Sequence, residues 1–336
     1  MSSLGPKMCE DLVIIEPSDF GRELEDLVPI NALNFARSEG QRAIPAIAKN
    51  PDLLLEIEMA AKRVPTRHQL FLGDSRFMEA IPDESVHLAV TSPPYWTLKE
   101  YPSHVGQLGS VEDYEEFLEE LDRVWRNVFR VLVPGGRLVV VVGDVCLPRR
   151  CFGRHVVFPL HASIQERCRK IGFDNLAPII WYKIANARFE SNNGSKFLGK
   201  PYEPNAIVKN DIEYILFQRK PGGYRKPSNA ARLLSVIPED LHKEWFQQIW
   251  TITGASTRKH PAPFPLALAE RLIRMFSFVG DTVLDPFMGT GTTNLAAGHW
   301  GRSSVGFEIE PTYFEMASNR LNKIRNKQLT LDFDGF

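Results

Sequence analysis

The chain has 336 residues, of which 43% are hydrophobic and 24% charged, and its formal net charge is −1. This length suits one large α/β domain with an insertion, or two domains. No apolar run approaches the roughly 20 residues that a membrane-spanning helix needs, and the N-terminus lacks the basic-then-apolar layout of a signal peptide, so we expect a cytoplasmic protein with no membrane partner. The four cysteines form no CxxC pair and no zinc spacing with His, which predicts neither a disulfide framework nor a metal site.

Charge is unevenly distributed along the chain. Residues 1–60 carry eleven acidic and five basic side chains, whereas residues 145–226 carry fifteen basic and six acidic ones. A segment this basic fits a surface that faces a polyanion, and an ordinary solvated face is the alternative.

The first half of the chain alternates between strand and helix patterns after an acidic, partly helical extension over 1–66. The best helical piece of the extension is Leu53–Lys62, which contains good helix formers and no breaker. We expect strands at 69–72, 86–90, 137–143 and 176–183, and helices at 111–132 and about 160–171, the first of these helices ended by Pro134-Gly135-Gly136. The apolar run at 137–143 is typical of a parallel strand buried on both faces, so the pattern predicts an α/β fold.

The alternation breaks at residues 184–207, which are polar, basic and rich in Gly and Asn. Loops longer than about 12–15 residues in compact domains are usually functional or disordered. A strand is expected at 211–218, and a second irregular basic region runs from 219 to about 255. Regular structure resumes with a helix at 263–278, a strand at 282–285, a helix from about 293, a strand at 304–307 and a helix at 313–325.

The stretch Thr91-Ser-Pro-Pro-Tyr-Trp96 follows the strand expected at 86–90. Two prolines cannot continue a strand or enter a helix interior, and each restricts the residue before it to extended conformations. The result is a stiff loop that holds a hydroxyl, backbone carbonyls and aromatic rings in place. Taken alone, such a stretch is more often an ordinary turn than a site.

A second motif, Val283-Leu-Asp-Pro-Phe-Met-Gly-Thr-Gly-Thr-Thr293, is an apolar strand ending in Asp285, a Gly-rich turn and a helix start. The next strand ends in Glu308, placed to accept hydrogen bonds from ribose hydroxyls, as in the nucleoside sites of doubly wound folds. The turn has no Lys for a P-loop, and Asn294 stands where a dinucleotide fingerprint needs Gly. A carboxylate also disfavours a pyrophosphate, so a ligand with ribose, adenine and a positively charged methionine group fits better: S-adenosyl-L-methionine.

The two motifs together closely resemble the DNA amino-methyltransferases, which methylate exocyclic amines of bases. The catalytic motif comes first and the cofactor loop about 190 residues later, the circularly permuted order of the β group, in which a target-recognition region lies between them. Gly73-Asp74-Ser75 resembles the acidic turn of that family, and Arg258–Pro265 resembles the motif before its cofactor strand. The resemblance covers roughly 67–325. It implies a Rossmann-like doubly wound methyltransferase fold, circularly permuted in motif order, with a catalytic half at 67–183, a target-recognition region at 184–255 whose strand 211–218 belongs to the sheet, a cofactor half at 256–326 and a tail at 327–336.

The resemblance also implies site residues. Ser92 Oγ and the Pro93 carbonyl accept hydrogen bonds from the amine of a flipped base, Tyr95 stacks on that base, and Trp96 is a candidate second platform. The implied catalytic motif is Ser92, Pro93, Pro94 and Tyr95. The implied cofactor residues are Asp74, Thr91, His260, Pro261, Asp285, Pro286, Phe287, Gly289, Gly291, Thr292, Thr293 and Glu308. Candidate DNA contacts are Trp96, Arg188, Asn192, Lys196, Lys200, Arg225 and Lys226, while Trp245 and Trp250 are expected to be local core.

The serine at position 92 bears on which base is methylated. In this family Ser-Pro-Pro-Tyr usually goes with cytosine N4 and Asp-Pro-Pro-Tyr with adenine N6, so the resemblance favours N4 methylation of cytosine in double-stranded DNA. Adenine N6 is the runner-up, and an RNA or protein methyltransferase or a catalytically silent DNA-binding protein are further alternatives. A restriction endonuclease acting on the same site is a candidate partner, the protein is a monomer or a homodimer, and the extension is a dimer contact or a lid over the DNA.

Overall fold

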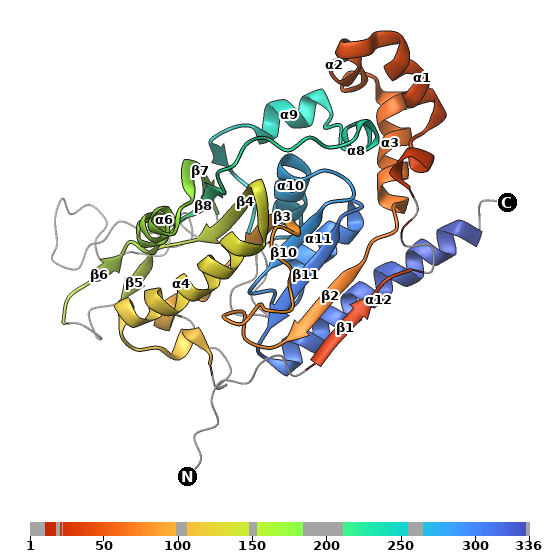
Figure 1. Cartoon of the computed structure of the whole chain (residues 1–336). Helices are drawn as coiled ribbons and strands as arrows, with labels where there is room; N and C mark the ends of the chain where they lie inside the picture. Colours follow the sequence, from red (N-terminus) through yellow and green to blue (C-terminus); the bar gives the residue numbers. More distant parts are fainter. Residues whose placement is uncertain are drawn as a thin grey trace, which may run out of the picture.

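The computed structural model describes residues 11–17, 21, 23–98, 106–147, 153–183, 211–254 and 265–333, with side chains described to residue 323. Within these residues nine strands form one sheet in the order β1-β2-β11-β10-β3-β4-β8-β7-β9 (Figure 1). The strands are β1 Asp11–Ile15, β2 His68–Leu72, β3 Val86–Thr91, β4 Leu132–Val142, β7 Asp174–Tyr182, β8 Ile212–Arg219, β9 Ile249–Trp250, β10 Thr282–Asp285 and β11 Ser303–Glu308, and a separate hairpin pairs β5 Val145–Leu147 with β6 Val156–Phe158.

The middle of the sheet is parallel. Strands β2, β11, β10, β3 and β4 run in the same direction, whereas β8 is antiparallel to β4 and to β7, and β1 is antiparallel to β2. From β10 the chain crosses to β11 on one side, and from β3 it crosses to β4 on the other side. The boundary between β10 and β3 is therefore the topological switch point, where ligands of such sheets bind at the carboxyl ends of the strands.

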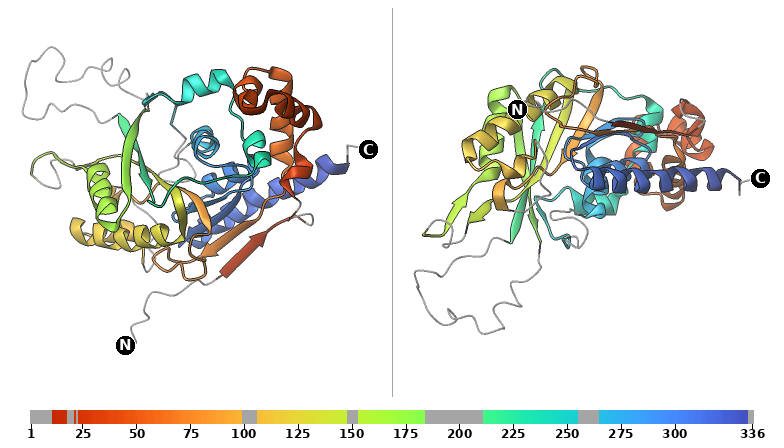
Figure 2. Two further views of the ribbon diagram at one scale, coloured as in Figure 1. Left: turned by 45° about the horizontal axis from the view of Figure 1, so that its top comes forward. Right: turned by 90° about the horizontal axis from the view of Figure 1, so that it is seen from below.

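Helices cover both faces of the sheet (Figure 2). On one face α4 Tyr114–Val131 and α6 Leu160–Ile171 pack on apolar side chains of β3 and β4, and on the other α10 Leu266–Phe276 and α11 Thr292–His299 do so. Helix α12 Pro311–Phe333 packs on β1 and β2. Helix α4 forms because its apolar residues recur at helical spacing and the Asp113 side chain accepts a hydrogen bond from the backbone N–H of Glu116, 2.9 Å away.

The helices of the N-terminal extension pack at the amino end of the sheet, whereas β1 pairs with β2 so that Asp11 lies beside Leu72 at the carboxyl end. The extension contains η1 Leu24–Leu27, α1 Ile30–Glu39, η2 Gly40–Arg42, α2 Ala43–Ile47 and α3 Pro51–Arg63. These helices form one core with α8 Asn229–Leu234 and with Val279, which stands just before β10. The helices α1–α3 themselves therefore do not cover the carboxyl edge, and the role of the extension as a dimer contact or a lid stays a prediction.

Most expected elements are confirmed, and two expectations are wrong. Helix α4 ends at Val131, and β4 begins at Leu132 and runs through Pro134-Gly135-Gly136, the residues expected to stop the helix. A register shift between Val86 and Leu88 and a positive φ of 79° at Gly135 let the strand pass these residues. The region 219–255, expected to be irregular, contains α8, α9 Glu239–Trp245 and β9. Its sequence is mostly polar, but a few of its apolar side chains are packed in the core. Trp245 and Trp250 are buried, as expected.

No helix in the described part of the chain is both long and apolar enough to cross a membrane. The shorter turns of the fold are η3 Trp96–Leu98 and η4 Leu108–Ser110, which flank the loop after the stretch Thr91–Trp96.

Packing of the extension on the sheet predicts a large effect of Gly301→Ala. A Cβ on Gly301 would lie 2.5 Å from the carbonyl oxygen of Ala61 in α3, closer than packed atoms approach, so α3 has to move. Gly40→Ala is the control, because Gly40 also has a positive φ but no atom within 4 Å of its added Cβ. We expect about 1–3 kcal/mol of destabilisation from backbone strain in both variants, and about 1–3 kcal/mol more in Gly301→Ala, measured by urea unfolding. Equal losses in the two variants would contradict tight packing of α3 against this turn.

Candidate active site

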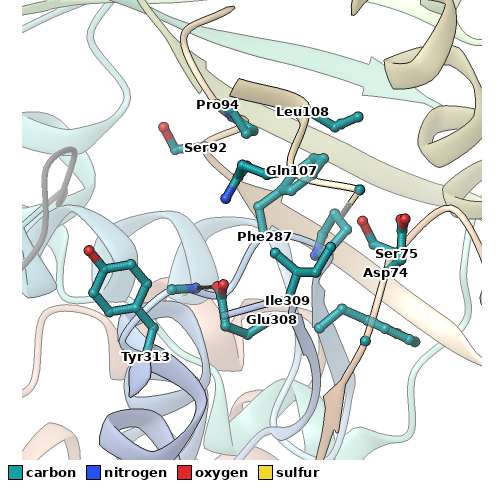
Figure 3. Close-up of a pocket in the computed structure, with 15 residues that line it drawn as sticks. Asp74, Ser75, Ser92, Pro94, Gln107, Leu108, Phe287, Glu308, Ile309 and Tyr313 are labelled. Carbon is teal, nitrogen blue, oxygen red and sulfur yellow. Dashed lines mark hydrogen bonds between the residues drawn. The ribbon is translucent and has the colours of Figure 1, made fainter. Parts of the chain in front are cut away.

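An open cleft lies at the carboxyl ends of β2, β11, β10 and β3, at the switch point of the sheet (Figure 3). Its empty volume is about 630 Å³, which includes space open to solvent. Its walls are formed by Gly73, Asp74, Ser75, Ser92, Pro94, Gly106, Gln107, Leu108, Pro286, Phe287, Gly289, Phe307, Glu308, Ile309 and Tyr313.

The stretch after β3 turns out of the sheet at the rim of this cleft. Ser92 is half-buried and lines the cleft, while Pro93, Pro94 and Tyr95 are buried beside it. The Thr91 hydroxyl points the other way and donates a 2.7 Å hydrogen bond to Asp285 Oδ1 at the end of β10. Thus the rigid loop is fixed at its start to the neighbouring strand.

Asp285 lies behind the cleft wall rather than in it. Its side chain is 1% exposed, and Oδ1 accepts from the Thr91 hydroxyl and from the backbone N–H of Phe287, 3.0 Å away. Burial raises the pKa of Asp285 to about 6, and these hydrogen bonds partly oppose that rise. The carboxylate therefore shapes the turn that carries Pro286 and Phe287 to the cleft.

The turn before α11 needs its glycines. Gly291 has a φ of 77° at the N-terminus of α11, and a Cβ there would lie 2.9 Å from the Ala317 Cβ of α12. Gly306 in β11 likewise leaves room for the Met288 sulfur, which a Cβ would overlap. Gly291 thus lets the turn approach α12, and Gly306 lets Met288 of the turn pack closely on β11.

Glu308 ends β11 and points into the cleft beside Tyr313 (Figure 3). Its Oε2 accepts from the N–H of Gly289 at 2.8 Å, and Oε1 accepts from the N–H of Glu310 at 2.9 Å. Burial raises the pKa of Glu308 to about 7, and the nearby Asp285 contributes to that rise. A second carboxylate with a raised pKa thus stands in the cleft wall, where a cationic or hydroxyl-bearing ligand would favour its ionised form.

Asp74 forms the opposite wall. The Arg76 guanidinium bonds both oxygens of this carboxylate and also Glu120 of α4. The pair of carboxylates raises the pKa of Arg76 despite its burial. The arginine therefore orients Asp74 beside Ser75 at the end of β2.

The structure brings together much of the site that the sequence predicts. In the cleft wall lie Ser92 and Pro94 of the catalytic motif and, of the cofactor residues, Asp74, Pro286, Phe287, Gly289 and Glu308. Behind the wall lie Thr91, Asp285 and Thr293, all buried. Gly291 is the N-cap of α11, and Thr292 is its first residue. His260, Pro261, Arg188, Asn192, Lys196 and Lys200 lie outside the described residues.

Sequence reasoning missed one wall of the cleft. Gly106, Gln107 and Leu108 follow the catalytic stretch, and Ile309 and Tyr313 follow β11. No motif marks the first three residues. The other two lie within five residues of Glu308, so the end of β11 was a usable signal for them.

Three candidate DNA contacts are placed elsewhere. Trp96 is 4% exposed, packs edge-on against Tyr114 and Phe158, and donates its indole N–H to the Val111 carbonyl, so the expectation of a free second platform is corrected. Arg225 forms an ion pair with Asp281, just before β10, and Lys226 is exposed at the same amino end of the sheet. Because this end is opposite to Ser92, their placement argues against contacts with a base at the cleft.

A family profile described as DNA methylase, for N6 and N4 methyltransferases, matches residues 86–319. The type II methyltransferase M.MjaI of Methanocaldococcus jannaschii is 39% identical over 302 residues, which cover 81% of this chain and 96% of the relative. The crystal structure of TTHA0409 from Thermus thermophilus, assigned as a DNA modification methylase and complexed with S-adenosyl-L-methionine, is 56% identical with a TM-score of 0.61, covering 77% of this chain and 95% of that one.

A more distant likeness concerns the fold alone. The structure of the PvuII DNA methyltransferase, described as cytosine-N4-specific, is 22% identical with a TM-score of 0.55 and covers 78% of this chain and 93% of that one. The open α/β sheet is thus shared at low sequence identity.

The raised pKa of Glu308 predicts a pH dependence of the unbound protein. Between the ordinary value of 4.5 and about 7, the folded state holds a proton that the unfolded state lacks, so this group makes the free energy of unfolding fall as pH rises through that window. The loss amounts to at most about 3 kcal/mol. Glu308→Gln cannot titrate, so the stability difference between wild type and this variant should shrink by that amount from pH 5 to pH 8 in urea unfolding.

The control is Glu244→Gln, since the Glu244 side chain on α9 is 60% exposed. A wild-type minus Glu308→Gln difference that stays constant with pH would show that Glu308 ionises normally in the folded state.

Proposed function

The chain belongs to the DNA methylase family that its residues 86–319 match, and on this premise we propose that it methylates the N4 amine of cytosine at a specific site in double-stranded DNA. It is an S-adenosyl-L-methionine-dependent DNA methyltransferase with a Rossmann-like fold. The assignment to cytosine N4 rests on the Ser-Pro-Pro-Tyr sequence of the loop, in which Ser92 lies at the rim of the cleft.

The cleft suits S-adenosyl-L-methionine by the chemistry of its walls. Apolar Phe287 and Ile309 offer surfaces for an adenine ring, and Glu308 offers carboxylate oxygens for ribose hydroxyls. Asp74 and Ser75 supply further polar groups on the opposite wall. When bound, the cofactor supplies an electrophilic methyl group on a sulfonium. The raised pKa of Glu308 fits a carboxylate that becomes fully ionised only when such a partner arrives.

The protein's part in the reaction is to prepare the amine. The exocyclic amine of cytosine is a weak nucleophile, because its lone pair is delocalised into the ring. Acceptors at Ser92 Oγ and the Pro93 carbonyl draw the two N–H bonds out of the ring plane and localise that lone pair. The amine would then form the new N–C bond as the bond from the methyl group to the sulfonium sulfur breaks and leaves a thioether, and one amine proton would pass to water. Positioning by these residues supplies most of the acceleration.

Access to the amine requires the target nucleotide to leave the duplex, since a base inside the stack is unreachable. Tyr95 is the ring of the loop that would stack on the extruded cytosine. The prolines hold this ring and the Ser92 hydroxyl in fixed relation, so the site is preformed before the base enters.

The basic segment at 145–226 supports a DNA-binding role, because its excess of positive charge suits the phosphate backbone. We place the recognition of the DNA sequence in residues 184–210. The type II relative supports a restriction–modification setting, with an endonuclease that cuts the same unmodified site. Adenine N6 methylation is the second candidate, since the matched family includes both amines.

The product of the reaction tests the proposal. DNA lacking modification is incubated with the protein and isotopically labelled S-adenosyl-L-methionine, digested to nucleosides and analysed by mass spectrometry. We expect labelled N4-methylcytosine, and sequencing of the modified DNA should reveal one recognition sequence. Label found only in N6-methyladenine would overturn the cytosine assignment, and label only in RNA or protein would overturn the DNA substrate.

Two variants should separate chemistry from cofactor binding. Ser92→Ala removes one acceptor for the amine, so we expect kcat to fall about 100- to 1,000-fold while cofactor affinity stays near wild type. Asp285→Asn disturbs the turn that carries Phe287, so we expect cofactor affinity to fall about tenfold or more. Isothermal titration calorimetry and single-turnover kinetics measure the two effects. Loss of cofactor binding in Ser92→Ala would contradict this division of roles.

A further inference from the structure

The row of strand ends beside Ser92 continues past β4 to β8 and β7. Val142 at the end of β4 pairs with Tyr214 near the start of β8, and Ile212 pairs with Tyr182 at the end of β7. Because β8 is antiparallel to both neighbours, its start lies at the same edge as the ends of β3, β4 and β7. Residues at this edge are next to the catalytic loop but outside the cofactor cleft.

Gly143 brings one of these residues against the catalytic tyrosine. A Cβ built on Gly143 would lie 3.4 Å from Tyr95 Cε1 and 3.2 Å from Glu213 Cγ. Tyr95 and Glu213 therefore both lie next to the position that a side chain at residue 143 would occupy. The absence of a side chain at position 143 lets the ring and the glutamate share this edge.

Glu213 holds Lys183 in place. The two side chains form an ion pair, in which the Lys183 ammonium donates to Glu213 Oε1, and this ammonium also lies 4.7 Å from the centroid of the Trp181 ring. Trp181 is fully buried and donates its indole N–H to the Ile252 carbonyl at 2.6 Å, so the platform under the ammonium is rigid. A lysine between a carboxylate and an aromatic face has little conformational freedom left to lose on binding.

Of the pair, the cation faces outward. The Lys183 side chain is 33% exposed and the Glu213 side chain 12%. An ammonium carries three N–H donors, of which Glu213 Oε1 takes one. Among the described residues Glu213 is the one hydrogen-bond acceptor for this ammonium, so two donors remain at the edge where Tyr95 lies.

We propose that Lys183, positioned by Glu213, determines base specificity by donating hydrogen bonds to N3 and O2 of the extruded cytosine. This inference rests on the proposed cytosine substrate. Beside its amine, cytosine presents two adjacent acceptors, N3 and O2, whereas adenine presents one acceptor, N1, followed by a C–H. An ammonium with spare donors satisfies both acceptors of cytosine and leaves one donor unmatched against adenine. Sites built on such hydrogen bonds reject a base that lacks the partner.

The test uses the full chain and a duplex that carries the recognition sequence found by modification sequencing. Lys183→Met keeps the aliphatic stem over Trp181 and removes the donors. We expect kcat/KM for N4-methylcytosine to fall about 10- to 100-fold, with unchanged affinity for S-adenosyl-L-methionine and partial recovery in Lys183→Arg. The control is Lys243→Met, because Lys243 forms an exposed ion pair with Glu239 on α9.

A substrate change identifies the contact itself. In a duplex with 3-deazacytosine at the target position, N3 is replaced by C–H. On this analogue, kcat/KM of the wild type should fall by nearly as large a factor as the Lys183→Met substitution causes on cytosine. For Lys183→Met itself, kcat/KM should be only slightly lower on the analogue than on cytosine. Equal further losses in the two proteins would mean that Lys183 does not bond N3 and would overturn the proposal.

The outcomes distinguish this inference from the proposed function. If the wild type yields N4-methylcytosine and Lys183→Met is fully active, the role of Lys183 is overturned, whereas the proposed function stands. Wild type that yields only N6-methyladenine overturns the cytosine substrate and this contact with it. If Lys183→Met fails to fold, as judged by cofactor affinity and circular dichroism, Glu213→Gln takes its place in the comparison with 3-deazacytosine, since it loosens Lys183 and should reduce the sensitivity to N3.

Discussion

Beside their backbone pairing and the bond from the Thr293 hydroxyl to the Val90 carbonyl, the strands β3 and β10 are joined by a buried hydrogen bond between two side chains. The Thr91 hydroxyl, at the end of the strand that leads to the catalytic loop, donates to Asp285, at the end of the strand that leads to the cofactor turn, and both side chains are almost fully inaccessible. A charge-assisted bond in such surroundings is costly to break, because the buried carboxylate would keep fewer hydrogen-bond donors, among them the N–H of Phe287. It helps to fix the Ser-Pro-Pro-Tyr loop relative to the turn of Pro286 and Phe287 in the cleft wall, and a methyltransferase depends on the alignment of its reacting groups.

The carboxylates around this bond show how the site is prepared for a positively charged ligand. Asp285 and Glu308 both have a raised pKa, chiefly because they are buried, and the proximity of Asp285 adds to the rise for Glu308. Keeping two carboxylates poorly solvated is unfavourable in the unbound protein. A positively charged ligand in the cleft would relieve part of that cost. The unbound site is therefore strained electrostatically, whereas its backbone geometry, set by Gly291 and Gly306, is already in place.

How far the sequence predicts this architecture depends on the range of the interactions involved. Ser92 to Tyr95 and Asp285 to Gly289 act through local backbone constraints, so a short motif was sufficient to find them. The course of β4 through Pro134-Gly135-Gly136 depends on its partner β3, and local stop signals misplace it. The positions of Trp96 and Arg225 could not be predicted for a similar reason. The ring of Trp96 packs on Tyr114, and Arg225 pairs with Asp281, and both partners are distant in the chain. Lys183 and Glu213 form a site only because an antiparallel strand brings them to the edge beside Gly143.

The order of strands in the sheet has a consequence for co-translational folding of the enzyme. Strands β10 and β11 lie between β2 and β3, yet they are synthesised about 200 residues after them. Until then, the facing edges of β2 and β3 have no parallel neighbours, and unpaired strand edges of this kind invite wrong pairing. The nascent chain therefore carries the complete Ser-Pro-Pro-Tyr loop without a cofactor cleft, and catalytic competence arises only when the last part of the chain inserts into the middle of the sheet.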